Sequence, residues 1–155
     1  MKRTVYIETT IFSFYFDSRP AQALRRKVTR DWWATQRRRF DVVTSPFAVE
    51  EASAPVYPHC RDAGAMARRL ALLEIVPDIA GIVKVYVENQ VMPADDAGDA
   101  AHLAVASYHG VDYLLTWNCQ HLANANKFEH IRAINRRLGL LTPDLVTPEQ
   151  LFTEV

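Results

Sequence analysis

The sequence predicts an α/β protein: a three-layer α/β/α sandwich around a central parallel sheet of four to five strands. Short apolar runs alternate with segments of helical periodicity along the chain, which is typical of successive βαβ units. A length of 155 residues with 49% apolar residues suits one hydrophobic core, so we expect a single domain over residues 1–155. No repeat or low-complexity tract interrupts this pattern.

The N-terminal part of the chain predicts a strand followed by two helices. Residues 5–7 are bulky β-branched or aromatic residues, which fill a sheet covered on both faces. Thr9 or Thr10 can cap the helix that follows. A long helix is then expected at about residues 21–39, with an apolar stripe at a spacing of four and a basic outer face. The stripe consists of Leu24, Val28 and Trp32.

The rest of the chain continues the alternation. Residues 40–45 form the second predicted strand, and Ser45 with Pro46 begins the next helix. Segment 80–92 alternates partly like a strand, but its length favours a helix. A helix is expected at 61–73, followed by a short third strand at 74–77 and a helix that is capped by Asp95 or Asp96 and ended by Gly110. A fourth strand is expected at 111–117, and a helix at about 128–138 is closed by Gly139. The last expected elements are a strand within 140–148 and a short helix that starts at Thr147 and Pro148.

The charge of the chain is unevenly distributed. The formal net charge is zero, but residues 19–39, which we call the basic segment, contain eight basic residues and one acid. The basic segment therefore carries +7 and the rest of the chain −7. Binding of a polyanion is one interpretation of this pattern, and a solvated helix face or a protein partner is the other.

Cysteine usage and the N-terminal sequence indicate a cytoplasmic protein with no membrane partner. Cys60 and Cys119 are too few for a disulfide framework, and no apolar run is long enough for a signal peptide or a bilayer span. Cys119 lies near His121, and Cys60 lies beside His59, but neither spacing is typical of a zinc site. Zinc is therefore not expected.

Several oxygen-bearing side chains are predicted to meet at one edge of the sheet. Glu8 follows the first strand, Asp99 lies at the start of the helix before the fourth strand, and Asn118 ends that strand. Glu50 or Glu51 joins them, since adjacent helical residues point about 100° apart and one of the two faces solvent. Functional groups gather at the carboxyl ends of parallel strands. Carboxylates placed together need a cation, and oxygen ligands favour Mg²⁺ or Mn²⁺.

Three motifs resemble the PIN-domain family, and its bacterial VapC-like branch of toxin ribonucleases in particular. They are YIETT at residues 6–10, SPFAVEEA at 45–52 and GDAAHLAVASYHGVDYLLTWNCQHLAN at 98–124, of which the third is the most specific. The likeness continues to LVTPEQLF at 145–152. It implies a parallel sheet flanked by helices, Mg²⁺- or Mn²⁺-dependent cleavage of RNA, and a homodimer held by an antitoxin protein.

The resemblance also implies which residues are catalytic and hold the metal. The acidic positions of the family fall on Glu8, on Glu51 rather than Glu50, on Asp99 and on Asn118. The first and fourth of these are usually aspartate in the family. Glu8 is one methylene longer, and Asn118 is neutral, so the choice between one and two metal ions stays open.

Two alternatives from other functional classes stay open as well. The chain can be a catalytically silent nucleic-acid-binding module, or a protein whose main role is to pair with a partner. Two further residues, Thr116 and His102, lie near the expected site in the sequence. Thr116 either hydrogen-bonds a water or a phosphate at the site or is structural. His102 is expected to be a helix residue packed near Asp99 rather than a metal ligand.

Overall fold

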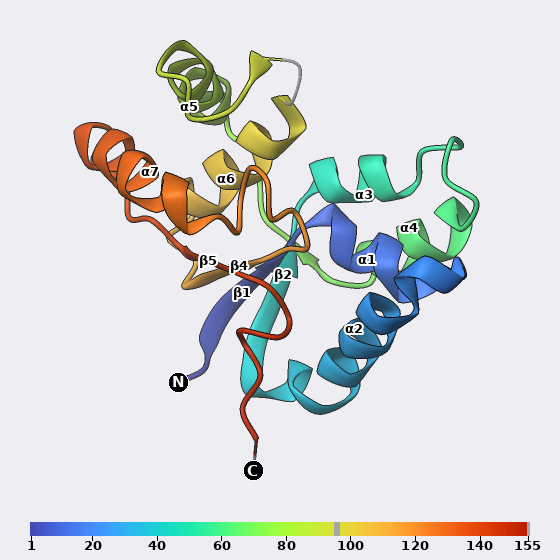
Figure 1. Ribbon diagram of the computed structural model, residues 1–155. Coiled ribbons are helices and arrows are strands. Elements are labelled where there is room, and N and C mark those ends of the chain that lie inside the picture. The colour runs from blue at the N-terminus through green and yellow to red at the C-terminus, as the bar shows by residue number, and fades with distance from the viewer. Residues whose placement is uncertain (95–96, 155) are drawn as a thin grey trace.

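A computed structural model describes residues 1–94 and 97–154, and it has a parallel five-stranded sheet between two layers of helices (Figure 1). The strands are β1 (Arg3–Ile7), β2 (Phe40–Thr44), β3 (Ala71–Leu72), β4 (Tyr113–Leu115) and β5 (Asp144–Val146). The helices are α1 (Thr9–Phe16), α2 (Ala23–Thr35), α3 (Pro46–Ala52), α4 (Cys60–Arg68), α5 (Pro77–Glu88), α6 (Ala97–Tyr108) and α7 (Ala125–Arg137), with two short 3₁₀ helices at Pro20–Gln22 and Arg37–Arg39. The predicted three-layer α/β/α sandwich is confirmed.

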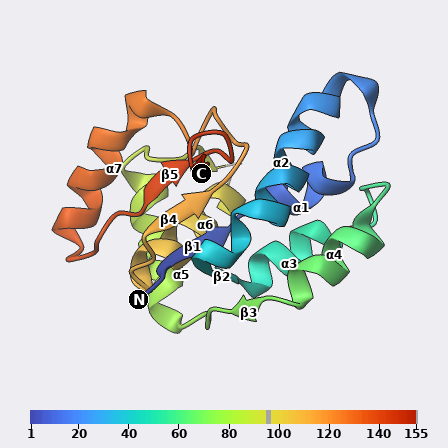
Figure 2. The ribbon, with the colours of Figure 1, turned by 90° about the horizontal axis from the view of Figure 1, so that it is seen from below.

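The two faces of the sheet bury two separate hydrophobic clusters. Successive residues of a strand point to opposite faces, so Val5 and Ile7 of β1 join one cluster and Tyr6 joins the other. The cluster on the face of Val5 contains residues of α1 to α4, and the cluster around Tyr6 contains residues of α5 to α7. Figure 2 shows these two groups of helices on opposite sides of the strands.

The order of the strands places a switch point beside β1. The sheet runs β3-β2-β1-β4-β5, so the chain builds outward from β1 in one direction and then continues from β4 in the other. Directly after β1, the backbone N–H of Glu8 donates to the carbonyl of Leu115 at the end of β4, at 3.1 Å. The carboxyl ends of β1 and β4 therefore lie together, where open α/β sheets bind their ligands.

The buried face of α2 differs from the predicted stripe. Trp32 is fully buried, but Leu24 is 69% exposed. The buried residues of this helix are Thr29 and Trp32, and Val28 is partly buried beside them. The Arg25 guanidinium lies over an aromatic ring, and the Thr29 hydroxyl accepts a hydrogen bond from the indole of Trp117 at 2.8 Å. Leu24 is exposed because it lies five residues before Thr29, which turns it about 140° away from that buried side chain.

The predicted helix starts need correction at two positions. Neither Thr9 nor Thr10 caps α1, because Glu8 is the N-cap residue and its carboxylate accepts from the backbone N–H of Thr10. Ser45 holds the N-cap position of α3, but its hydroxyl makes no capping bond. It meets the hydroxyl of Tyr6 instead, at 2.7 Å. Asp95 and Asp96, the predicted caps of α6, lie outside the described residues.

Two further elements are also corrected. The third strand is Ala71–Leu72 rather than 74–77, because these two residues pair with Val43 and Thr44 of β2. The helix expected from Thr147 is a single turn, in which the Thr147 carbonyl accepts from the N–H groups of Gln150 and Leu151.

The helix expected at 61–73 ends earlier, at Arg68, while other expectations agree with the structure. Segment 80–92 lies largely in helix α5, as its length predicts. Gly110 and Gly139 both have a positive φ after the ends of α6 and α7, a conformation that glycine adopts without steric cost. Within the described parts of the chain, no helix combines the length and apolar character needed to cross a membrane.

Candidate functional site

A pocket of about 520 Å³ opens at the carboxyl ends of β1 and β4, close to where β1 leads into α1 in Figure 1. Its wall includes Glu8, Glu51, Asp99 and Asn118. These are the four side chains that the sequence pattern assigned to one cleft. They come from four places far apart in the chain, and the switch point of the sheet brings them together.

Glu8 is held rigidly at the base of the pocket. Its side chain is buried, with the residue only 3% exposed. Its Oε1 accepts hydrogen bonds from the Thr116 hydroxyl at 2.7 Å, from the Thr10 backbone N–H at 3.1 Å and from the Thr10 hydroxyl. No hydrogen bond from the described residues reaches Oε2. Thr116 therefore acts by orienting Glu8, and one oxygen of Glu8 keeps its acceptor capacity for a ligand.

Glu51, rather than Glu50, faces the pocket. Glu50 is exposed on the other side of α3, whereas the Glu51 side chain is 43% exposed within the pocket wall. Its Oε1 accepts a hydrogen bond from the Thr9 hydroxyl at 2.8 Å and another from Nε2 of His102. Burial raises the pKa of Glu51, but these bonds and the charge of His102 outweigh burial and hold that pKa below its ordinary value.

The start of α6 lies directly against Glu51. Asp99 is half-buried in the first turn of this helix. At the preceding position, a Cβ built on Gly98 would lie only 2.9 Å from Oε2 of Glu51. The glycine therefore allows a close approach of the helix to that oxygen, at the position directly before Asp99.

His102 lies beneath the pocket and is fully buried. Burial lowers the pKa of its imidazole, but the hydrogen bond to Glu51 and the negative charges of the pocket carboxylates outweigh burial, so that pKa lies above its ordinary value. His102 is a packed helix residue that does not line the pocket, as expected, and it also holds Glu51 through a hydrogen bond. The sequence does contain a signal: His102 follows Asp99 by three residues, a spacing that places both on one helix face.

Asn118 lines the pocket but has a local task as well. Its Oδ1 accepts the backbone N–H of His121 at 3.0 Å, which closes the turn after β4. Its own backbone N–H donates to the Thr116 hydroxyl at 2.9 Å. A carbonyl oxygen has two lone pairs, so Asn118 can still accept from one further partner, though with less charge than a carboxylate offers.

The basic segment does not form one surface at the pocket. Arg19 lines the pocket and pairs with Asp17, and Arg25 lies over the rings of Phe14 and Trp117 nearby. Arg37–Arg39 immediately precedes β2, at the opposite edge of the sheet. Only the N-terminal end of the basic segment therefore stands close enough to contact a ligand that occupies the pocket.

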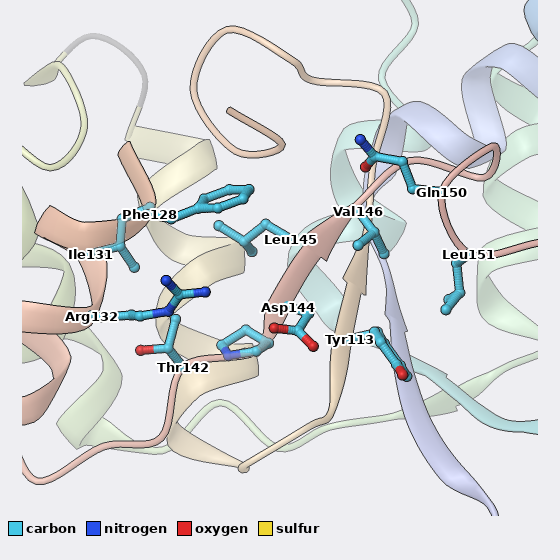
Figure 3. A pocket seen from close by; sticks show the side chains of 11 residues that line it. Tyr113, Phe128, Ile131, Arg132, Thr142, Asp144, Leu145, Val146, Gln150 and Leu151 are labelled. Atoms are coloured by element: carbon cyan, nitrogen blue, oxygen red, sulfur yellow. The ribbon is translucent and has the colours of Figure 1, made fainter. Parts of the chain in front are cut away.

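A second hollow, of about 270 Å³, lies between α7 and β5 (Figure 3). Its wall is formed mainly by Phe128, Ile131, Leu145 and neighbouring apolar side chains. It lacks the gathered carboxylates of the first pocket and lies away from the switch point. We therefore take the pocket of Glu8 and Glu51 as the candidate site.

The donors of this site suit a hard divalent cation by their chemistry. All are oxygens, and Oε2 of both Glu8 and Glu51 accepts no hydrogen bond from the described residues. Among those same residues, no group of three or more acidic, histidine or cysteine side chains is already gathered at metal-binding distances. Binding of a cation therefore requires side-chain adjustment within the pocket.

Comparison with models of known protein families gives no match for this chain, and no curated protein matches it either. The resemblance to PIN domains accordingly depends on the sequence motifs alone. The geometry of the pocket is an independent observation.

Proposed function

We propose that this protein is a metal-dependent endoribonuclease of the PIN type. In this proposal Glu8, Glu51 and Asp99 hold Mg²⁺ or Mn²⁺, and Asn118 completes the oxygen set directly or through water. The observation that carries the proposal is the joint presence of these four residues in the wall of one pocket at the switch point of the sheet. The sequence motifs support the same assignment.

The proposed reaction is hydrolysis of a phosphodiester bond of RNA. A water oxygen bonds to phosphorus in line while the bond to the 3′ oxygen breaks, which leaves a 5′-phosphate and a 3′-hydroxyl. A bound divalent cation supplies Lewis-acid chemistry for such a step, by acidifying water and neutralising charge on the phosphate. The protein contributes orientation, since Thr10 and Thr116 fix Glu8 while Thr9 and His102 fix Glu51.

The basic residues near the pocket support a polyanionic substrate. Arg19 lies in the pocket wall, and the exposed Arg25 is held over Phe14 at the pocket edge. Contacts of this kind bind the phosphate backbone without reading its sequence. A role as the toxin of a type II toxin–antitoxin pair, with a cytoplasmic homodimer and an antitoxin partner, extends the proposal on the strength of the motif likeness.

The proposal is tested by incubating the protein with tRNA, rRNA and single-stranded DNA at a series of Mn²⁺ concentrations. We expect RNA cleavage that depends on Mn²⁺ and stops when EDTA is added. Glu8→Gln should lower the rate by at least about tenfold, since each factor of ten corresponds to only about 1.4 kcal/mol of transition-state stabilisation. The amide keeps a carbonyl oxygen for the bonds from Thr10 and Thr116, so this variant removes charge and preserves the helix cap.

The control for this experiment is Glu50→Gln, an identical change at the exposed neighbour of Glu51, and it should cleave like the parent. RNA binding that survives EDTA, with no cleavage at any Mn²⁺ concentration, would instead identify a silent binding module. The hydrogen bond from His121 to Asn118, which occupies part of the fourth oxygen ligand, is the observation that favours this second candidate.

A further inference from the structure

We propose that His102 is a positioning residue that fixes the carboxylate of Glu51 through a buried hydrogen-bond chain and thereby sets the affinity of the pocket for a divalent cation. This inference rests on the proposed function. It assigns a role to a residue that does not line the pocket and that the motif comparison did not include among the site residues.

The chain of hydrogen bonds runs from the interior to the pocket. The Ser45 hydroxyl meets the Tyr6 hydroxyl at 2.7 Å, and the Tyr6 hydroxyl meets Nδ1 of His102 at 2.6 Å. On the other side of the ring, Nε2 reaches Oε1 of Glu51. Ser45, Tyr6 and His102 are all fully buried, so water does not compete for these bonds.

The ionised carboxylate gives this chain a direction. A carboxylate only accepts, so Nε2 of His102 donates to Glu51. When the ring is neutral, Nδ1 accepts, so Tyr6 donates to His102 and Ser45 donates to Tyr6; when the ring is charged, Nδ1 donates to Tyr6 instead. Every member is satisfied in this arrangement, and the imidazole is held in one orientation.

Glu51 depends on this support more than Glu8 does. Glu8 is buried and receives three hydrogen bonds on one oxygen, whereas the Glu51 side chain is 43% exposed. Apart from His102, the Thr9 hydroxyl is the only group among the described residues that donates a hydrogen bond to the Glu51 carboxylate. Without the imidazole, the long Glu51 side chain can turn toward solvent, and ordering it again on a cation costs rotamer entropy.

His102 acts through Glu51 rather than as a ligand itself. Both of its ring nitrogens are occupied by protein groups, and the ring lies beneath the pocket wall. In metal sites generally, a residue that hydrogen-bonds to a metal ligand orients that ligand without touching the metal, and His102 stands in this relation to Glu51. Loss of such a partner typically weakens metal binding by about 10- to 100-fold.

The test is isothermal titration of purified protein with Mn²⁺, for the parent and for His102→Leu. We expect the dissociation constant of the variant to rise by about 10- to 100-fold. His102→Gln should recover part of the lost affinity, because its amide nitrogen can donate to Glu51 while leucine cannot. Thermal unfolding of each variant establishes that it is folded. If His102→Leu does not fold, Tyr6→Phe removes the hydroxyl that orients Nδ1 and should also weaken Mn²⁺ binding.

His109→Leu is the matched control, since His109 is a half-buried histidine just beyond the far end of α6 that does not line the pocket, and it should bind Mn²⁺ like the parent. A folded His102→Leu protein with parental affinity, alongside weakened binding by Glu51→Gln, would overturn this inference and leave the proposed function standing. A parent protein that binds no Mn²⁺ would overturn both.

Discussion

Asp99→Asn is expected to lower metal-dependent RNA cleavage by more than about a hundredfold while the protein stays folded. The change keeps the size of the side chain and removes one of the three pocket carboxylates that the proposed metal site uses. Charge stabilisation by a bound cation is worth several kcal/mol in the transition state, and about 2.7 kcal/mol corresponds to a hundredfold in rate. The measurement is the initial rate of RNA cleavage at a saturating Mn²⁺ concentration.

The fold should tolerate this substitution. An acid in the first turn of a helix contributes only about 0.3–1 kcal/mol through the helix dipole. Asp78→Asn is the matched control, because Asp78 occupies the first turn of α5, is exposed and does not line the pocket. Cleavage by Asp99→Asn at the rate of the Asp78→Asn protein would remove Asp99 from the proposed mechanism.

Trp32→Ala is expected to produce the largest loss of stability, about 3–5 kcal/mol. The indole is fully buried on α2 and stacks on Phe40 with a centroid separation of 6.0 Å. Its Nε1 donates to the carbonyl of Leu151 at 2.8 Å, which ties the C-terminal segment to α2. Truncation therefore leaves a large cavity and an unpaired carbonyl, and urea unfolding followed by circular dichroism measures the cost.

The control for Trp32 lies on the same helix. Leu24→Ala changes a residue that is 69% exposed, so its effect should stay within about 0.5 kcal/mol. The comparison of the two variants also tests whether Leu24 packs inward, as the predicted stripe implies, or is exposed, as the structure shows. Equal destabilisation by both substitutions would contradict the observed orientation of this helix.

The fold was largely predictable because its main signals are local. The alternation of apolar runs with helical periodicity identified the layers, and glycines at the ends of α6 and α7 marked two helix ends correctly. Two errors have tertiary causes. The buried face of α2 includes Thr29, whose hydroxyl accepts a hydrogen bond from Trp117, and an apolar stripe does not reveal a buried threonine. Strand β3 is only two residues long and exists because it pairs with β2.

The sequence predicted which acidic residues line the candidate site, but it did not predict the hydrogen bonds that hold their carboxylates in place. Glu8 and Asp99 stand at strand and helix ends that the sequence indicates, and the motif register separated Glu51 from Glu50. The bonds that hold these acids join distant residues, such as Thr9 with Glu51, 42 positions apart, and Tyr6 with His102, 96 positions apart. No local pattern encodes such pairs, because the paired residues are distant in sequence and meet only after the sheet and helices have packed together.

The most direct test of the metal proposal is a crystal of this protein soaked in Mn²⁺ and measured at a wavelength where manganese scatters anomalously. We expect an anomalous peak inside the pocket, at about 2.0–2.2 Å from carboxylate oxygens of Glu8, Glu51 and Asp99, which is the spacing typical of a small hard divalent cation. A fully soaked crystal with no peak there, or with manganese bound only elsewhere on the molecule, would contradict the proposed metal site.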